Sequence, residues 1–313
     1  MSSSRWLLGT ALAALFLAIV ALGADRMLTN AIKHSDALAA GRLARLRDPR
    51  PPEEIPIFGS SKAEADYVPS VLGRGFYNYG LGATGLNVTN WLLAQELRQP
   101  SRQPVVIDLV QWTVVEFGDA RNYVAIAQHA DVREFLKRAG LWRWYYAVPG
   151  LRYFNAWDWY VKGLLTDRIA LTKRFDHGFN VNLDEAPWSR AEFQEKVATR
   201  LALNYPLGID PDEKLKLLKL MRSAPDRQFV VVLSPLHKSF FVHKNGEAEL
   251  YEELRQMDDD LPNLHVINMT RANFPDQYFL DTAHLNQRGA RVFSTQLRAE
   301  LTRLKIIKNT PES

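Results

Sequence analysis

Cysteine is absent from the 313 residues of this sequence. Its absence excludes a disulfide scaffold, a thiolate metal site and a cysteine nucleophile. It does not decide the compartment, because many exported proteins lack disulfides. Hydrophobic residues make up 47% of the chain and charged residues 24%, a globular composition that excludes wholesale disorder.

Excess charge of one sign is also scarce, since the net charge is only +4. Residues 25–50 hold six basic residues against three aspartates, and Arg5 supplies the remaining positive charge. The globular remainder is electrically balanced. A basic nucleic-acid surface is therefore excluded, and we expect no nucleic-acid partner.

One long hydrophobic run is present at the N-terminus. Trp6–Ala24 contains no charged residue, and a helix of this length spans roughly 28 Å, close to the thickness of a bilayer core. The flanking charges favour the N-terminus inside and the bulk of the chain outside. We expect residues 1–24 to be a signal anchor, with residues 6–24 in the lipid bilayer. A signal peptide cleaved after Ala21-Leu22-Gly23 and a buried soluble helix remain alternatives.

A helical stalk or linker is expected over residues 25–52. It ends at the breaker cluster 48–52, a candidate domain boundary. Its basic stripe could contact lipid headgroups, and a solvated helix face explains the same pattern.

Residues 53–306 alternate between strand and helix patterns, and residues 307–313 form a tail. Apolar runs predict strands, and helical spacing predicts helices between and after them. The expected strands are Ile55–Phe58, Gly75–Leu81, Val105–Trp112, Phe229–Leu233 and Leu264–Met269, and the expected helices are Leu86–Leu97, 191–204, 211–222, 246–258 and Gln287–Leu304. We therefore expect an α/β domain, a flavodoxin-like three-layer sandwich with a parallel sheet and sites at the carboxyl ends of its strands.

A helical insertion is expected over residues 113–228, between the third and fourth strands. Within it, residues 142–160 include nine aromatic residues. These rings could form a helical core, a platform for sugar stacking or a membrane-facing surface.

Three segments carry candidate chemistry. Gly59-Ser60-Ser61-Lys62 follows the first strand, where a sharp turn could expose the Ser61 hydroxyl and its own N–H. An ordinary structural turn would explain this segment equally well.

The second segment is Asp281-Thr282-Ala283-His284, just before the last helix. A carboxylate that orients an imidazole allows the imidazole to accept a proton from a serine hydroxyl. The competing interpretation is that Asp281 caps the helix and His284 is a surface residue.

The third segment, 78–85, is a glycine-rich turn after the second strand, whose backbone could supply another oxyanion donor. Its Gly-x-Gly-x-x-Gly spacing imitates a dinucleotide loop, but it follows the second strand rather than the first. Dinucleotide binding is disfavoured.

Taken together, the three segments resemble the SGNH/GDSL hydrolase superfamily, and more narrowly its membrane-anchored bacterial branch, which includes alginate O-acetylation and teichoic acid D-alanylation proteins. The resemblance covers roughly 55–115 and 228–304, and its most specific part is Asp-x-x-His-Leu-Asn-x-x-Gly (281–289). It implies that Ser61 is the nucleophile, His284 the base and Asp281 its orienting acid. It also implies an oxyanion hole built from the backbone N–H groups of Ser61 and of Gly82 or Ala83.

Two positions depart from the family pattern. Ser60 stands where the family usually has Asp, and Gln111 is the nearest substitute for the Asn of the third family block. Gln111 is therefore a candidate oxyanion donor. Lys62, His237 and Asn286 are candidate substrate-binding residues, although a structural role for His237 is an alternative. We expect no cofactor and no catalytic metal, because the histidines lack metal-ligand spacing.

The resemblance implies an externally facing acyl esterase or O-acyltransferase, anchored in the bacterial inner (cytoplasmic) membrane, that acts on a cell-envelope or secreted polysaccharide. Its partners would be an acylated glycan or acyl donor, and a membrane-bound acyltransferase or polysaccharide synthesis complex. The alternative is a non-catalytic binding or assembly component of such a complex.

Overall fold

The computed structural model describes residues 3–36, 38–109, 111, 115–169, 175–180, 189–201, 207–241 and 246–308. The chain divides into two compact units. Unit 1 comprises residues 1–48 and 119–172, and unit 2 comprises residues 49–118 and 173–313.

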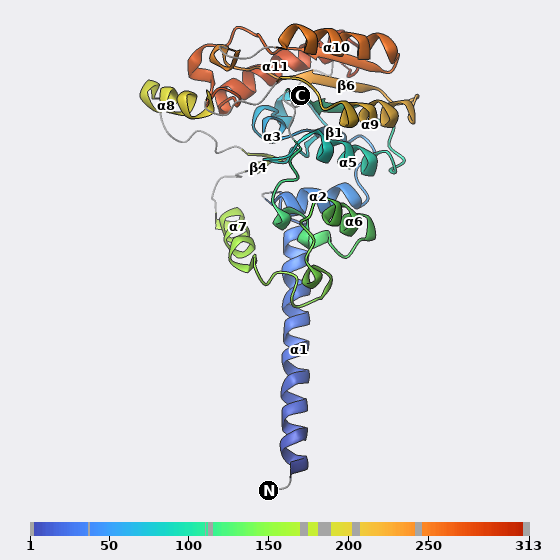
Figure 1. The fold of residues 1–313 in the computed structure, drawn as a ribbon, viewed down its shortest axis with the longest axis vertical. Coiled ribbons are helices and arrows are strands. Elements are labelled where there is room, and N and C mark those ends of the chain that lie inside the picture. The colour runs from blue at the N-terminus through green and yellow to red at the C-terminus, as the bar shows by residue number, and fades with distance from the viewer. Residues whose placement is uncertain are drawn as a thin grey trace. The chain divides into compact units, whose positions relative to one another are not determined.

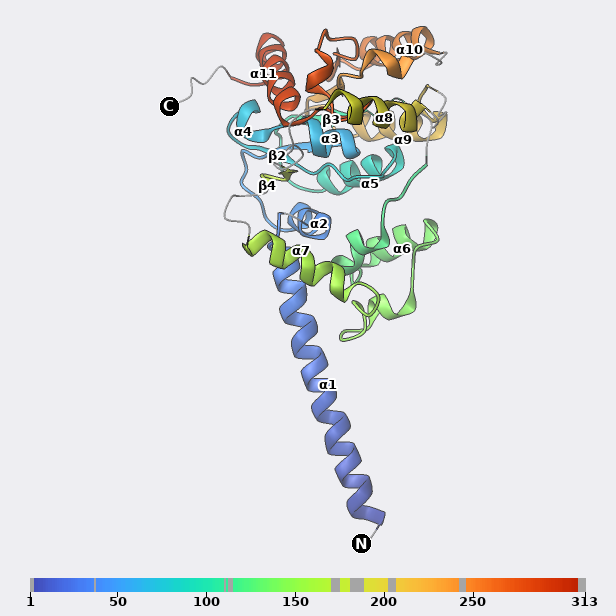
Figure 2. The same ribbon diagram turned by 90° about the vertical axis from the view of Figure 1, so that its left-hand side faces the viewer.

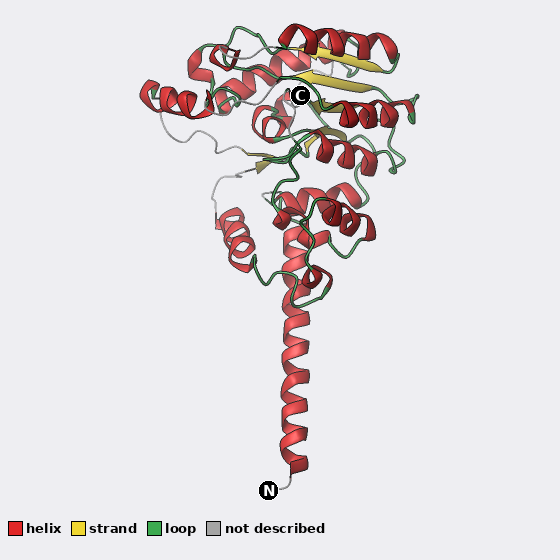
Figure 3. Ribbon diagram, in the orientation of Figure 1, coloured by secondary structure: helices red, strands yellow, loops and turns green. Residues whose placement is uncertain are grey.

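Unit 2 is built on a five-stranded parallel sheet (Figure 3). The strands are β1 (Ile55–Phe58), β2 (Phe76–Asn78), β3 (Val105–Asp108), β6 (Phe229–Leu233) and β7 (Leu264–Asn268). Their order is β2-β1-β3-β6-β7, which is the flavodoxin-like order when these five strands are numbered along the chain. The predicted α/β class is confirmed. The order reverses at β1, between β2 and β3, and this is where doubly wound folds bind ligands.

One face of the sheet is covered by α3 (Ser61–Asp66), α4 (Pro69–Leu72) and α11 (Gln287–Arg303) (Figure 2). Alternate strand residues such as Ile57, Val106 and Val230 point to this face and pack in one buried cluster with Phe293 and Leu297 of α11. Strands buried on both faces are continuously apolar, which is why β1 and β6 could be recognised in the sequence.

The helices α5 (Leu86–Glu96), α9 (Pro211–Arg222) and α10 (Glu247–Asp260) pack on the opposite side (Figure 1). The remaining elements of unit 2 are the antiparallel pair β4 (Phe175–Asp176) and β5 (Phe179–Asn180), helix α8 (Arg190–Leu201) and the 3-10 helices η3 (Lys238–Phe241) and η4 (Asp276–Tyr278).

Unit 1 is helical (Figure 2). It contains α1 (Ser3–Lys33), α2 (Ala39–Arg47), η1 (Ala120–Ile126), α6 (Ala130–Arg138), η2 (Trp144–Ala147) and α7 (Trp157–Ile169). Segment Trp6–Lys33 of α1 is long and apolar enough to cross a membrane. The Arg47 guanidinium donates to both oxygens of Asp131, at 2.7 and 2.9 Å, and so joins α2 to α6.

Three sequence-based expectations need correction. The expected helical stalk or linker comprises the end of α1, which finishes at Lys33, and α2, which is part of unit 1 and in which Arg42 is buried instead of solvated. The second and third strands end earlier than predicted, at Asn78 and Asp108, and Trp112 lies outside the described residues. The insertion between β3 and β6 is divided, because its residues 119–172 belong to unit 1 and the rest to unit 2.

Candidate functional site

A sharp turn at the carboxyl end of β1 places Ser61 at the first position of α3. Gly59 in this turn has a φ of +153°, and a Cβ there would lie 2.8 Å from the Ala63 Cβ and 2.9 Å from the Asp108 Cβ. Only glycine lets the strand pass into the helix this closely. Ser60 is the N-cap residue, and its hydroxyl accepts from the Lys62 N–H at 3.4 Å. This explains why Ser60 can stand at this position.

The glycine turn after β2 packs directly against α3. A Cβ on Gly80 would lie 2.4 Å from the Glu64 backbone nitrogen, and one on Gly82 would lie 3.0 Å from the Glu64 carboxylate. The buried Asn78 side chain donates to the carbonyls of Ala63 (2.7 Å) and Tyr67 (3.0 Å), and its oxygen accepts from the Gly80 N–H (2.9 Å). Asn78 therefore fastens the glycine turn to the helix that carries Ser61.

The loop before α11 brings Asp281 and His284 next to Ser61. The His284 Nε2 lies 2.8 Å from the Ser61 Oγ, and its Nδ1 lies 2.9 and 3.0 Å from the two Asp281 oxygens. Asp281 also accepts from the backbone N–H groups of Ala283 (2.7 Å) and His284 (2.9 Å). With Nδ1–H donated to Asp281, Nε2 is left as the acceptor for the serine hydroxyl.

The same loop is pinned to α3 and to α11. Asp66, the last residue of α3, accepts from the Leu285 N–H at 2.8 Å. Asn286 caps α11 through the Gly289 N–H (3.0 Å) and donates to the Gln277 carbonyl (2.8 Å). Because α3 carries Ser61 at one end and Asp66 at the other, these contacts fix the distance between the serine and the histidine.

A buried ionisable cluster lies beside this row. Lys62, Asp66 and Asp108 are at most 1% exposed. Burial lowers the pKa of Lys62 and raises the pKa of both carboxyls, and the opposite charges only partly offset burial. Asp108 accepts from the Tyr67 hydroxyl at 2.9 Å and from the Ser234 hydroxyl at 2.6 Å. The cluster joins the ends of β3 and β6 to α3.

We expect Asp66→Asn to flatten the pH dependence of stability. Burial holds the pKa of Asp66 well above its usual value, so the folded state binds a proton more tightly than the unfolded state. Stability then falls as the pH rises from about 4 through the raised pKa. The asparagine keeps an oxygen for the Leu285 N–H but cannot ionise.

Urea unfolding of the full chain at about pH 5, 6.5 and 8 measures this slope, with the exposed Asp226→Asn as the matched control. The variant should lose less unfolding free energy across this range than wild type or Asp226→Asn. Parallel curves for all three proteins would contradict the assignment.

The backbone N–H groups predicted to donate to the oxyanion are not used in the described part of the fold. Among the described residues, no acceptor pairs with the N–H of Ser61, Gly82 or Ala83. Ala83 is exposed and adopts a φ of +55°, in the left-handed region that non-glycine residues rarely enter. Gln111, the third predicted donor, is buried, and its side-chain amide donates to the Ser234 carbonyl at 3.4 Å.

The three residues predicted to bind substrate are buried and make hydrogen bonds within the fold. Lys62 is fully buried and donates to the carbonyls of Ser234 (3.1 Å) and Pro235 (3.2 Å). Asn286 is buried and holds the cap of α11. The hydrogen bonds of both side chains stabilise the loops around the site.

His237 is also buried, in agreement with the structural alternative. Its Nδ1 contacts the Ser239 hydroxyl at 2.6 Å, and its Nε2 contacts the Asp276 carboxylate at 3.2 Å. Its ring lies edge-on to Phe193 and Phe279. Both ring nitrogens are thus used within the fold.

Sequence reasoning missed the roles of Asn78, Asp66 and Asp108. Asp108 could have been noticed, since an acidic residue that ends a wholly apolar strand must have buried partners. Asp66 gave no such indication, because its partner is a backbone N–H more than two hundred residues away.

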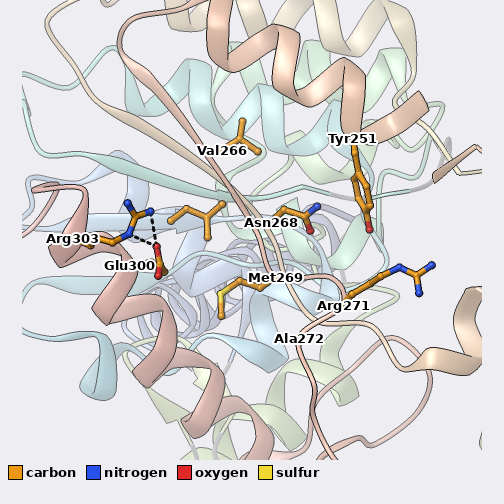
Figure 4. Close-up of a pocket in the computed structure, with 9 residues that line it drawn as sticks. Tyr251, Val266, Asn268, Met269, Arg271, Ala272, Glu300 and Arg303 are labelled. Atoms are coloured by element: carbon orange, nitrogen blue, oxygen red, sulfur yellow. Dashed lines mark hydrogen bonds and ion pairs between the residues drawn. The ribbon is translucent and has the colours of Figure 1, made fainter. Parts of the chain in front are cut away.

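A separate open pocket of about 640 Å³ lies at the β7 edge of the sheet, between α10 and α11 (Figure 4). Tyr251, Asn268 and Met269 line it, and its two arginines are paired, Arg303 with Glu300 and Arg271 with Glu247. It contains none of the Ser61, His284 or Asp281 side chains. Across the described residues, no group of three or more acidic or histidine side chains could hold a metal ion.

Comparisons with known proteins do not name a family. No protein-family model matches this chain, and no curated protein does. A solved structure from Streptococcus pneumonia, provisionally described as a platelet activating factor, aligns over 93% of this chain and 99% of its own, with a TM-score of 0.42 and 11% identity.

Proposed function

We propose that this protein is a membrane-anchored serine esterase or O-acyltransferase of the SGNH/GDSL type, which acts on an acylated cell-envelope or secreted polysaccharide. The observation that carries the proposal is the hydrogen-bonded row Ser61–His284–Asp281, with a serine-to-imidazole distance of 2.8 Å. A neutral imidazole held by a carboxylate is the arrangement that activates a serine hydroxyl.

In the first step, the Ser61 Oγ attacks the acyl carbonyl while His284 Nε2 takes the hydroxyl proton. The N–H groups of Ser61 and of Gly82 or Ala83 stabilise the negative charge on the former carbonyl oxygen. The carbon–oxygen bond to the sugar then breaks, and His284 returns the proton to the departing sugar oxygen. An acyl-serine is left on the enzyme.

In the second step, His284 removes a proton from the incoming nucleophile, which attacks the acyl-serine. Water as the nucleophile gives a free acid, and a glycan hydroxyl gives a new ester; both routes restore the Ser61 hydroxyl and neutral His284.

The apolar helix α1 supports a location at a membrane. The proposal places this anchor in the bacterial inner membrane and unit 2 on its periplasmic or extracellular side. An acylated glycan or a separate acyl donor would reach the site from that side. A membrane-bound acyltransferase or a polysaccharide synthesis complex is the partner that such a location favours.

The proposal is tested by incubating the full chain with an O-acetylated bacterial polysaccharide and an unacetylated oligosaccharide acceptor. Released acetate and acetylated acceptor are both measured by mass spectrometry. Wild type should form one or both products, and His284→Gln should form them at least about 10³-fold more slowly. A His284→Gln protein as active as wild type, or no product under any condition, would favour the non-catalytic assembly role.

A further inference from the structure

The aromatic segment of unit 1 divides into buried and exposed rings. Tyr146, Tyr153 and Tyr160 are at most 8% exposed and form the helical core of this unit. Another set of large apolar side chains on unit 1 is open to the surroundings. Its members are Met27 (76%), Trp144 (68%), Leu151 (42%), Phe154 (78%), Trp157 (53%) and Leu165 (52%), here called the collar.

Residues 150–153, next to the collar residues Leu151 and Phe154, pack along the end of the membrane-crossing run of α1. Gly150 lies against Ala21, since a Cβ on this glycine would be 3.2 Å from the Ala21 Cβ. The next residues follow α1 away from that point: Arg152 pairs with Asp25 at 3.0 Å, and the Tyr153 hydroxyl contacts the Thr29 hydroxyl at 2.7 Å. Gly150 therefore contacts α1 within the uncharged run, which ends at Ala24.

The depth of these contacts fits the bilayer interface. The run from Trp6 to Ala24 matches the hydrocarbon core, and the polar interfacial layer adds about 5–7 Å on each side, which is about four residues of helix. Asp25, at the first charged position of α1, is 5% exposed and is neutralised by Arg152. A charge placed at the edge of the core is expected to be paired in this way.

A groove between α1 and α7 continues the same apolar surface. It has a volume of about 790 Å³ and is lined by Ala24, Met27 and Leu28 of α1 and by Trp157, Val161 and Leu165 of α7, among others. The end of the groove nearest the N-terminus of α1 is at Ala24, where the membrane-crossing run also ends. The apolar end of the groove at Ala24 therefore lies at the depth of the lipid chains, and its other end, lined by Asn30, His34 and Ser35, is polar.

We propose that the collar lies in the interfacial layer of the leaflet from which α1 emerges, and that lipid of this leaflet occupies the apolar end of the α1–α7 groove at Ala24. Tryptophan and phenylalanine side chains are suited to this layer, where a large apolar ring gains from contact with acyl chains. Exposed Arg26 and Arg143 beside the collar are placed to meet anionic headgroups. The collar then holds the rest of unit 1 against the membrane surface, in addition to the tether that α1 provides.

The absence of cysteine allows a direct test with single labels. Phe154→Cys and Leu151→Cys are each labelled with a nitroxide in the full-length chain, and Leu215→Cys on α9, 63% exposed in unit 2, is the matched control. Each protein is reconstituted at one copy per nanodisc of phosphatidylcholine and phosphatidylglycerol. Electron paramagnetic resonance then measures collisions with oxygen, which enters lipid, and with a water-soluble nickel chelate.

The labels at positions 154 and 151 should show an oxygen-to-nickel collision ratio at least about five-fold above that at position 215. Equal ratios at the three positions would overturn the proposal. Labels open to nickel in discs but protected in native membranes would also overturn it, because a protein partner would then cover the collar.

Discussion

Ser61→Ala is expected to lower kcat/KM for an acetyl ester by about 10⁴–10⁶-fold, because it removes the hydroxyl that we propose attacks the acyl carbon. The loss falls mainly on kcat, since the amides of Ser61, Gly82 and Ala83 still bind the ester. The fold should be retained, because the substitution removes one side-chain contact worth about 0.5–1.5 kcal/mol. Ester hydrolysis and thermal unfolding of the same preparations measure both effects.

Ser70→Ala is the matched control, since Ser70 is exposed on α4 of the same unit. It should leave both kcat/KM and the unfolding midpoint unchanged. An active Ser61→Ala protein, with more than about a tenth of the wild-type kcat/KM, would show that Ser61 is not the nucleophile.

Asp108→Ala is expected to lower the free energy of unfolding by about 3–5 kcal/mol, the usual cost of breaking a buried charged network. It strands the Tyr67 and Ser234 hydroxyls, which donate to this carboxylate at 2.9 and 2.6 Å. It also removes a negative charge near the buried Lys62. Urea unfolding followed by circular dichroism measures the loss.

Asp108→Asn separates the two causes. The asparagine keeps an oxygen for the hydroxyls but not the charge, so its loss should be smaller, about 1–2 kcal/mol. Equal losses in the alanine and asparagine variants would mean that the charge near Lys62 is the main stabilising factor. Losses below about 1 kcal/mol in both would contradict the role assigned to the cluster.

Much of unit 2 could be predicted from local patterns. The strand predicted at Phe229–Leu233 matches β6 residue for residue, because a run of five buried apolar residues has no helical alternative of that length. The helix predicted at 211–222 matches α9, which begins at Pro211 behind the Asp210 cap. Local pattern singled out the three segments of the candidate site, but only their resemblance to the SGNH/GDSL superfamily joined them into one site.

The side chains around the row could not be assigned in this way. Lys62, His237 and Asn286 are residue types that often bind substrate, and only their tertiary partners show that they stabilise loops. Conversely, nothing near Asp66 in the sequence indicates its bond to the Leu285 N–H. Hydrogen bonds between distant segments decide these roles, and residue type alone does not.

Unit 1 illustrates the same limit. The run Trp6–Ala24 predicts a long apolar helix on its own, because nothing but residue type is needed. The division of the aromatic segment into buried tyrosines and an exposed collar depends on how the chain returns to α1 at Gly150 and Arg152. Composition left three interpretations of that segment open, and contacts with α1 separate its core residues from its surface residues.

The most direct test of the central claim is covalent labelling with a fluorophosphonate, followed by peptide mapping. This reagent modifies a serine hydroxyl only where a base activates it. Wild type should gain one adduct, located on Ser61, and His284→Gln should react far more slowly. An unmodified wild-type chain at saturating reagent, or an adduct on another serine, would contradict the account.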